Sequence, residues 1–125
     1  MNDEHRKVII IDDDDRNIFA LKAVLKAKGF IVIAATSAKE GLEILQTQKD
    51  IGIALIDMMM PDMDGYQMIA EIKKQPPLKN MPLIAVTAQA MVGDREKCLE
   101  MGADNYIAKP INVDVLLTIL NQYLK

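Results

Sequence analysis

Two groups of acidic side chains in this sequence could hold a metal ion together. Asp12 and Asp13 open a run of four aspartates after the apolar residues Val8–Ile11, and Asp57 follows the apolar residues Ile53–Ile56. If the fold brings these carboxylates together, their like charges disfavour full ionisation unless a cation lies among them. Carboxylates without histidine or cysteine partners select Mg²⁺, with Mn²⁺ as a substitute, over Zn²⁺. These positions therefore predict a magnesium site.

A hydroxyl and an amine follow two further apolar runs. Thr87 comes directly after Leu83–Val86, and Lys109 comes directly after Asn105–Ala108. A lysine beside a divalent cation indicates an anionic third participant, and a cation, a lysine and a hydroxyl together can bind phosphoryl oxygens. An aspartate can itself be the nucleophile that accepts a phosphoryl group. The residue types therefore favour phosphoryl-transfer chemistry.

Short apolar runs predict the strands that must position these residues. They are too short for stable helices and lack the apolar–polar alternation of a surface strand, so they read as strands buried on both faces of a parallel sheet. The five runs are Val8–Ile11, Phe30–Ala35, Ile53–Ile56, Leu83–Val86 and Asn105–Ala108.

Segments with helical spacing of apolar residues follow each run. Gly29 ends the first helix, Thr36 or Ser37 caps the second, the third ends before Pro76–Pro77, Gly102 stops the fourth, and the fifth runs to the last residue. The apolar positions that mark the helices are Ile18, Leu21 and Leu25; Leu42 and Leu45; Tyr66, Ile69, Ala70 and Ile72; Cys98, Leu99 and Met101; and Val113, Leu116, Leu117, Leu120 and Leu124. Five strand–helix units predict a three-layer α/β sandwich with right-handed crossovers. Its ligand site lies beyond the carboxyl ends of the strands, where the candidate residues stand.

Length and composition exclude several classes of function. We expect one domain over residues 1–125, with a polar tail at residues 1–6 and no output domain. The sequence shows neither a signal peptide nor a membrane-spanning run, which predicts a cytoplasmic protein. The single cysteine (Cys98) excludes an internal disulfide, and the single histidine (His5), in the polar tail, argues against Cys–His catalysis. The net charge of −3 gives no electrostatic reason to bind nucleic acid.

Four motifs together resemble one protein family. They are the pair Asp12–Asp13, the stretch DMMMPDMDG at Asp57–Gly65, the pair Thr87-Ala88, and YIAKP at Tyr106–Pro110. In this order, each at a strand end, they resemble the receiver domain of two-component response regulators over essentially the whole chain. Residues 87–99 resemble the receivers of hybrid histidine kinases in particular. The resemblance implies a flavodoxin-like fold with a parallel five-stranded sheet in the order 2-1-3-4-5.

The resemblance also implies a role for each acidic residue. Asp57 would be the phosphoacceptor. Asp13 would bind Mg²⁺ directly, Asp12 would do so mainly through water, and the backbone carbonyl of Met59 would complete the protein ligands together with Asp57. Because Met59 contributes its backbone, its side chain is free to vary.

The remaining roles concern the phosphoryl oxygens and the response to them. The Thr87 hydroxyl, the Ala88 backbone N–H and Lys109 would each bind one phosphoryl oxygen. Thr87 would move inward on activation, and Tyr106 would turn from exposed to buried. The bond between Lys109 and Pro110 is usually cis in the family.

A phosphorylation-controlled switch is therefore the leading functional hypothesis. It would take a phosphoryl group from a histidine kinase or a histidine phosphotransfer domain. It would be a stand-alone protein or part of a hybrid kinase. As a monomer or weak dimer, it would signal through the surface of the fourth helix, fifth strand and fifth helix. It would catalyse its own aspartyl phosphorylation and dephosphorylation without being a dedicated enzyme. Three alternatives stay open: a phosphohydrolase with an aspartyl nucleophile, a flavodoxin-like electron carrier and a phosphorylation-independent interaction module. Met59 weakens the first, because it stands where such a hydrolase needs a second acid.

Other polar and sulfur-containing residues have structural readings. Asp14 and Asp15 favour the first turn of a helix. Asp62 and Asp64 are typical of turns and caps, with Gly65 supplying backbone freedom. The three consecutive methionines are typical of flexible gap-fillers, and Cys98 of a small buried residue.

Overall fold

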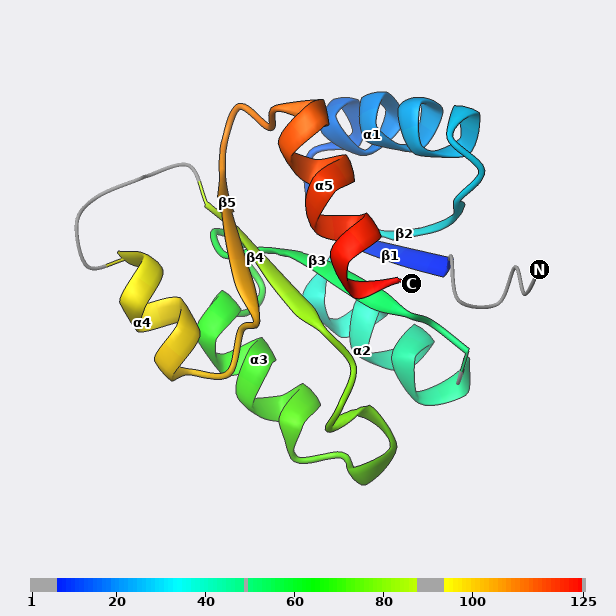
Figure 1. Cartoon of the computed structure of the whole chain (residues 1–125). Coiled ribbons are helices and arrows are strands. Elements are labelled where there is room, and N and C mark those ends of the chain that lie inside the picture. The colour runs from blue at the N-terminus through cyan, green and yellow to red at the C-terminus, as the bar shows by residue number, and fades with distance from the viewer. Residues whose placement is uncertain (1–6, 49, 88–93, 125) are drawn as a thin grey trace.

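Strands and helices alternate along the whole described chain. The computed structural model describes residues 7–48, 50–87 and 94–124. Its elements, shown in Figure 1, are β1 (Lys7–Ile11), α1 (Asp15–Ala27), β2 (Ile31–Ala35), α2 (Ala38–Thr47), β3 (Ile53–Asp57), α3 (Gly65–Lys73), the short 3₁₀ helix η2 (Pro76–Leu78), β4 (Leu83–Thr87), α4 (Asp94–Glu100), β5 (Asn105–Ala108) and α5 (Val113–Tyr123).

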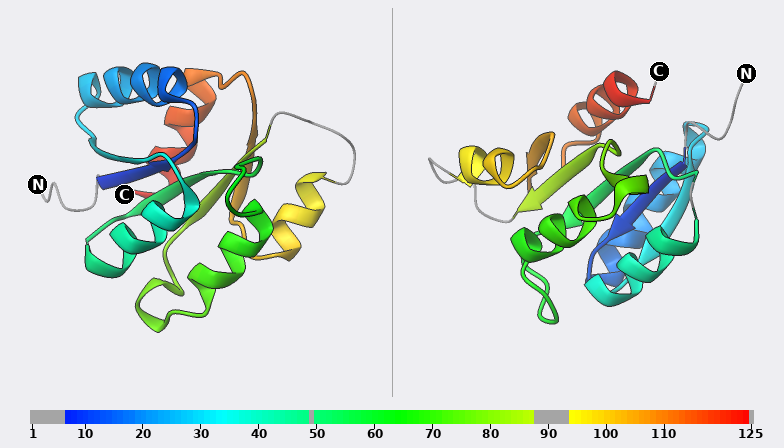
Figure 2. Two further views of the ribbon diagram at one scale, coloured as in Figure 1. Left: turned by 180° about the vertical axis from the view of Figure 1, so that it is seen from behind. Right: turned by 90° about the horizontal axis from the view of Figure 1, so that it is seen from below.

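The strands form one parallel sheet that helices cover on both faces. The strand order is β2-β1-β3-β4-β5, and every neighbouring pair is parallel. Helices α1 and α5 lie on one face, and α2, α3 and α4 lie on the other (Figures 1 and 2). The predicted three-layer sandwich and its strand order are confirmed.

The sheet separates two apolar cores. Along β1, Ile9 and Ile11 pack into the core beneath α2, α3 and α4, whereas Val8 and Ile10 pack into the core beneath α1 and α5. This alternation follows from the two-residue period of a strand, whose side chains point to opposite faces. Because both faces are covered, the central strands are apolar except at their end residues Lys7, Asp57 and Thr87.

The prediction that all five strands are buried on both faces holds for the central strands only. Every residue of β3 and β4 is buried, but β2 and β5 are the edges of the sheet and are partly exposed. Ile31 in β2 is exposed, and the predicted first residue of this strand, Phe30, precedes it. An edge strand has a neighbouring strand on one side only, so it can carry polar or solvent-exposed side chains.

Several predicted boundaries shift by one or two residues. β3 and β4 each extend one residue further than predicted, so Asp57 and Thr87 are the last residues of their strands. The fourth helix ends at Glu100 rather than including Met101, and the fifth ends at Tyr123. At the ends of β3 and β4 the polar residue still pairs with the neighbouring strand, although the run of apolar residues has ended.

Side-chain caps begin the helices as the sequence predicts. Asp14 is the N-cap of α1 and accepts a hydrogen bond from the Arg16 N–H at 2.9 Å, while Asp15 lies in the first turn. Ser37, not Thr36, caps α2. Gly29, with a φ of 91°, follows the last turn of α1 in the left-handed conformation that glycine adopts readily.

The turn between β3 and α3 corrects one prediction. Asp64 caps α3, and Asp62 accepts hydrogen bonds at the start of α2 instead. Gly65 does not have a positive φ, so backbone freedom does not explain it. A Cβ atom at this position would lie 2.6 Å from the Cα atom and from the sulfur of Met58. Residue 65 is therefore glycine because the backbone of the turn passes too close for any side chain.

Candidate functional site

The candidate residues lie together at the end of the sheet where the strands have their carboxyl ends. In the register of the sheet, Ile11 pairs with Ile56 and Asp57 pairs with Val86. Asp12 therefore stands just beyond β1, level with the end of β3. The backbone N–H of Lys109 donates to the Thr87 carbonyl at 2.7 Å, which fixes the segment after β5 beside the end of β4.

Three carboxylates meet at this end of the sheet, as predicted. Asp12, Asp13 and Asp57 each offer a carboxylate oxygen that lies within 4.8 Å of the others. Asp12 and Asp57 are each only 3% exposed, whereas Asp13 is exposed. All three donors are oxygens, so the set has the chemistry that Mg²⁺ prefers.

A network of hydrogen bonds orients Asp12. Its carboxylate accepts from the Asp14 backbone N–H at 2.9 Å and from the side-chain amide of Asn17. Sequence reasoning did not identify Asn17 as a site residue. The available signal was its place in the first turn of α1, the helix that begins directly after the acidic run.

Lys109 supplies the positive charge of the site. Its Nζ atom lies 3.4 Å from Oδ2 of Asp57 and 3.6 Å from Oδ2 of Asp12. The peptide bond between Lys109 and Pro110 is cis, as predicted from the resemblance. The lysine therefore faces two buried carboxylates at once, where it offsets part of their mutual repulsion.

The environment of Asp57 raises the pKa of its carboxyl group above the usual value. Burial is the main cause, and the nearby charge of Asp12 acts in the same direction. The Met59 backbone N–H, which donates to Asp57 Oδ1 at 3.0 Å, and the Lys109 ammonium lower the pKa in opposition. A carboxylate that is poorly solvated and crowded by another carboxylate gains from any bound cation.

The two predicted switch residues lie on neighbouring strands. Thr87 is buried at the end of β4, and Tyr106 in β5 is half-buried and packs against the core beneath α2, α3 and α4. Tyr106 pairs in register with Ala85. Ala88, whose N–H was predicted to bind a phosphoryl oxygen, lies outside the described residues.

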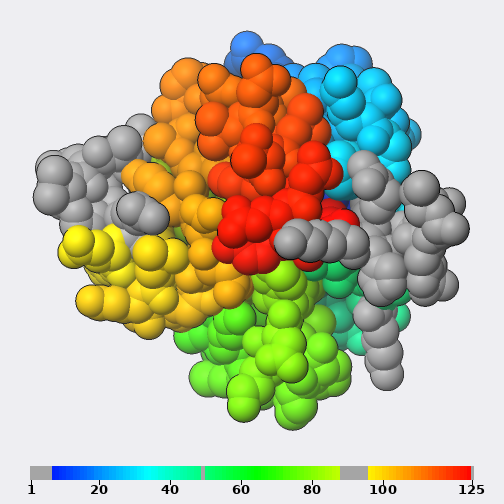
Figure 3. All heavy atoms as spheres, in the orientation of Figure 1, coloured from blue at the N-terminus to red at the C-terminus, as the bar shows by residue number. Residues whose placement is uncertain are grey.

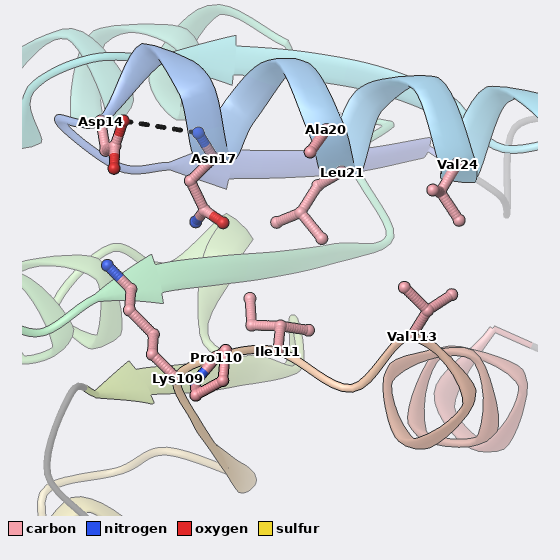
Figure 4. A pocket seen from close by; sticks show the side chains of 9 residues that line it. All are labelled: Asp14, Asn17, Ala20, Leu21, Val24, Lys109, Pro110, Ile111 and Val113. Carbon is pink, nitrogen blue, oxygen red and sulfur yellow. Dashed lines mark hydrogen bonds between the residues drawn. The ribbon is translucent and has the colours of Figure 1, made fainter.

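A groove of about 540 Å³ runs from this site between α1 and the start of α5. Figure 4 shows Asn17 and Lys109 at one end of the groove and Val24 and Val113 at the other. The polar end thus joins the carboxylate cluster, and the far end is apolar.

Comparison with known proteins decides the family. The sequence model of the response regulator receiver domain matches residues 8–121, which is nearly the whole chain. The chain belongs to the response regulator receiver domain family. Receiver domains act as phosphoacceptors in two-component signalling and interact with histidine kinases or phosphotransfer domains.

Relatives of this receiver domain include short and long proteins. The chain is 38% identical to the sensor histidine kinase CheAY of Helicobacter pylori over 119 residues, which cover 94% of this chain and 15% of that protein. It is 30% identical to the polar-differentiation response regulator DivK of Brucella ovis, with 95% of this chain and 96% of that protein covered. The receiver domain thus spans nearly all of one relative and a small part of another.

A solved structure agrees in fold and bears on the acidic site. The receiver domain of the sensor histidine kinase PA1611 of Pseudomonas aeruginosa superimposes with a TM-score of 0.86 at 30% identity, covering 95% of this chain and 97% of that chain. That protein has a magnesium ion coordinated in its active-site cleft. Within the described residues of the present receiver domain, no helix is both long and apolar enough to cross a membrane.

Proposed function

We propose that this receiver domain takes a phosphoryl group onto the Asp57 carboxylate from a phosphohistidine of a histidine kinase or a histidine phosphotransfer domain. One observation carries the proposal. Asp57 is buried at a strand end, within 4.8 Å of the Asp12 and Asp13 carboxylates and 3.4 Å from the Lys109 ammonium. A carboxylate nucleophile, a set of oxygen ligands and a fixed cation are the parts that aspartyl phosphorylation needs.

The residues present fit Mg²⁺ as the cofactor. Asp13 and Asp57 would bind it directly, Asp12 mainly through water, and Met59 through its backbone carbonyl. When bound, Mg²⁺ neutralises negative charge on the transferring phosphoryl group. Burial, and after it the charge of Asp12, raise the pKa of Asp57, and a cation held among these carboxylates would offset both effects.

The protein groups orient the transfer. A carboxylate oxygen of Asp57 attacks phosphorus in line with the nitrogen of the donor histidine, so the P–O bond forms as the P–N bond breaks. The Met59 N–H holds the Asp57 carboxylate in place. Lys109 turns from the carboxylates to one phosphoryl oxygen, and the Thr87 hydroxyl and the Ala88 N–H bind the other two.

The decisive experiment uses acetyl phosphate as a small phosphodonor. With Mg²⁺ present, intact-protein mass spectrometry should show one added phosphoryl group, which peptide mapping places on Asp57. Asp57→Ala should gain none. Asp15→Asn is the matched control, because Asp15 belongs to the same acidic run but lies exposed in the first turn of α1, and it should react like the wild type. A phosphoryl group that remains in Asp57→Ala contradicts the proposal, and a wild type that gains none indicates a phosphorylation-independent interaction module.

The metal assignment has a separate test. Asp13→Ala should lose both Mg²⁺ binding, measured by calorimetric titration, and phosphorylation, while its circular dichroism stays that of the folded protein. Asp13 is exposed, so its removal leaves the core intact. Mg²⁺ affinity that survives in Asp13→Ala refutes the ligand set.

The output surface in this proposal comprises α4, β5 and α5. Figure 3 shows β5 at the surface between these two helices on one face of the molecule. Tyr106 lies in β5, and Thr87 ends the adjacent strand, β4. An inward movement of Thr87 toward a phosphoryl oxygen would open space behind it for Tyr106, which changes the shape of this surface and could alter dimerisation through it.

A further inference from the structure

Three consecutive methionines follow the phosphoacceptor strand, and their exposure differs sharply. Met58 is 7% exposed and Met60 is 6% exposed, but Met59 between them is 63% exposed. The prediction that all three fill gaps in the core is therefore wrong for Met59. Among the described methionines, Met59 is the most accessible, followed by Met101 at 41%.

The turn after β3 holds Met59 outward. Met58 and Met60 both belong to the core beneath α2, α3 and α4. Gly65, the first residue of α3, packs directly against the backbone and sulfur of Met58. With both neighbours anchored in the core, the side chain of Met59 stays on the solvent side of the turn.

Met59 is also fixed to the reactive carboxylate. Its backbone N–H donates to Asp57 Oδ1 at 3.0 Å. The only described methionine in this turn that water reaches freely is thus the one attached to the carboxylate that our proposed function makes the phosphoacceptor. The Met59 side chain is exposed two residues from Asp57, so a change in its polarity would alter the solvent near that carboxylate without touching the core.

We propose that Met59 is a site of reversible oxidation by a peroxide, and that its sulfoxide shortens the life of the phosphorylated state. The sulfur lone pair attacks one peroxide oxygen as the O–O bond breaks. An S–O bond forms, and with hydrogen peroxide as the oxidant the remaining oxygen leaves as water after proton transfer. Sulfur loses two electrons and the peroxide gains them, and reductases of methionine sulfoxide reverse the change.

The effect on lifetime follows from polarity. Hydrolysis of an aspartyl phosphate needs a water that protein groups orient behind phosphorus. A thioether is a weak acceptor and orients water poorly, whereas a sulfoxide oxygen accepts a strong hydrogen bond. One added hydrogen bond to the attacking water gives about a three- to tenfold faster decay. This second part of the inference rests on the proposed function, and the first part does not.

The first measurement is the order of oxidation. The folded receiver domain is treated with dilute hydrogen peroxide, and peptide mapping follows each methionine. Met59 should oxidise much faster than Met58 and Met60. Equal rates at the three positions, or faster oxidation of either neighbour, overturn the assignment of the site.

The second measurement is the decay of the phosphoryl group on Asp57 before and after oxidation. Wild type should decay about three- to tenfold faster once oxidised. Met59→Leu should decay at one rate regardless of peroxide. Met101→Leu is the matched control, because Met101 is exposed but precedes β5, at the opposite end of that strand from Lys109, and it should respond like the wild type.

The outcomes separate this inference from the proposed function. If unoxidised wild type takes no phosphoryl group on Asp57, the proposed function fails and the lifetime effect falls with it. If Asp57 is phosphorylated but oxidation leaves the decay unchanged or slower, only the present inference fails. A peroxide response that persists in Met59→Leu overturns it in the same way.

Discussion

The carboxylate of Asp62 accepts a hydrogen bond from the backbone N–H of Ala38 at 3.2 Å, although the two residues are 24 positions apart. The same carboxylate accepts a second bond from the Lys39 N–H, also at 3.2 Å. Backbone N–H groups in the first turn of a helix have no partner within the helix, and Asp62 supplies one for these two. The turn that carries Met59 is thereby attached to a neighbouring helix.

Removal of this attachment should loosen the turn beside Asp57. Asp62→Ala should lose about 1 kcal/mol of unfolding free energy, as for other lost helix caps, and should speed amide hydrogen exchange at Met59. Ser37→Ala is the matched control, because the Ser37 hydroxyl caps the same helix by accepting from the Glu40 N–H at 3.1 Å. It should lose similar stability and leave exchange at Met59 unchanged. Equal exchange at Met59 in the two variants would show that Asp62 only caps α2.

Gly65 should tolerate substitution less well than Gly41. In Gly65→Ala the new Cβ atom would meet the Met58 backbone at 2.6 Å, which cannot yield without moving the turn. We expect a loss of about 1–3 kcal/mol, measured by urea unfolding.

The comparison variant Gly41→Ala tests the reason. Its Cβ atom would meet the end of the Ile11 side chain at 2.8 Å and the end of the Met68 side chain at 3.1 Å. Flexible side-chain ends can move, and alanine favours the helix that contains residue 41. The loss should be smaller than in Gly65→Ala, and a larger loss would mean that backbone contact does not decide the cost.

Stability of the metal-free domain should depend on the ionisation of Asp57. Because the pKa of Asp57 is raised in the folded state, its contribution to stability is full at low pH and is lost as the pH rises through the folded-state pKa. Asp57→Asn should therefore melt a few degrees higher than wild type at neutral pH with EDTA present. This gain should vanish in acid.

Asp50 provides a control of opposite sign. Its pKa is lowered by the hydrogen bond from Lys7, whose Nζ lies 2.7 Å away, so its contribution is present at neutral pH and is lost in acid. Asp50→Asn should not raise the melting temperature at any pH. If Asp57→Asn melts lower than wild type at neutral pH, burial does not dominate the environment of Asp57.

The proposed switch should appear when a phosphoryl mimic binds. Beryllofluoride with Mg²⁺ should shift backbone amide resonances over about residues 87–112, with Tyr106 among them, because Thr87 and Tyr106 lie on adjacent strands. Tyr106→Ala should keep the shifts at Asp57 and lose those in α4. Shifts confined to the acidic cluster in wild type would mean that the site and this surface are not coupled.

The sequence predicted the parts of the site that depend on strand ends. The apolar runs placed Asp57 and Thr87 at the carboxyl edge of a parallel sheet, where the structure has them. Features that depend on contact between distant segments were missed. Nothing local in the sequence shows that Asp62 accepts hydrogen bonds from the start of α2, or that residue 65 has no room for a side chain.

The exposure of Met59 was missed for a related reason. Its residue type predicts burial, as it does for Met58 and Met60, and only the path of the turn separates them. A run of three identical residues carries no internal signal for which one faces water. The difference arises from tertiary packing, chiefly from the close approach of α3.

The placement of Lys109 ties the charge balance of the site to an edge strand of the sheet. The carboxylates stand on or beside the central strands β1 and β3, but Lys109 follows β5, which has a strand neighbour on one side only. Edge segments open locally at lower free energy than the centre of a sheet. A brief detachment of β5 would withdraw the cation and leave the carboxylates beside β1 and β3 in place. The receiver domain can thus change the electrostatic character of its site by a fluctuation too small to unfold it.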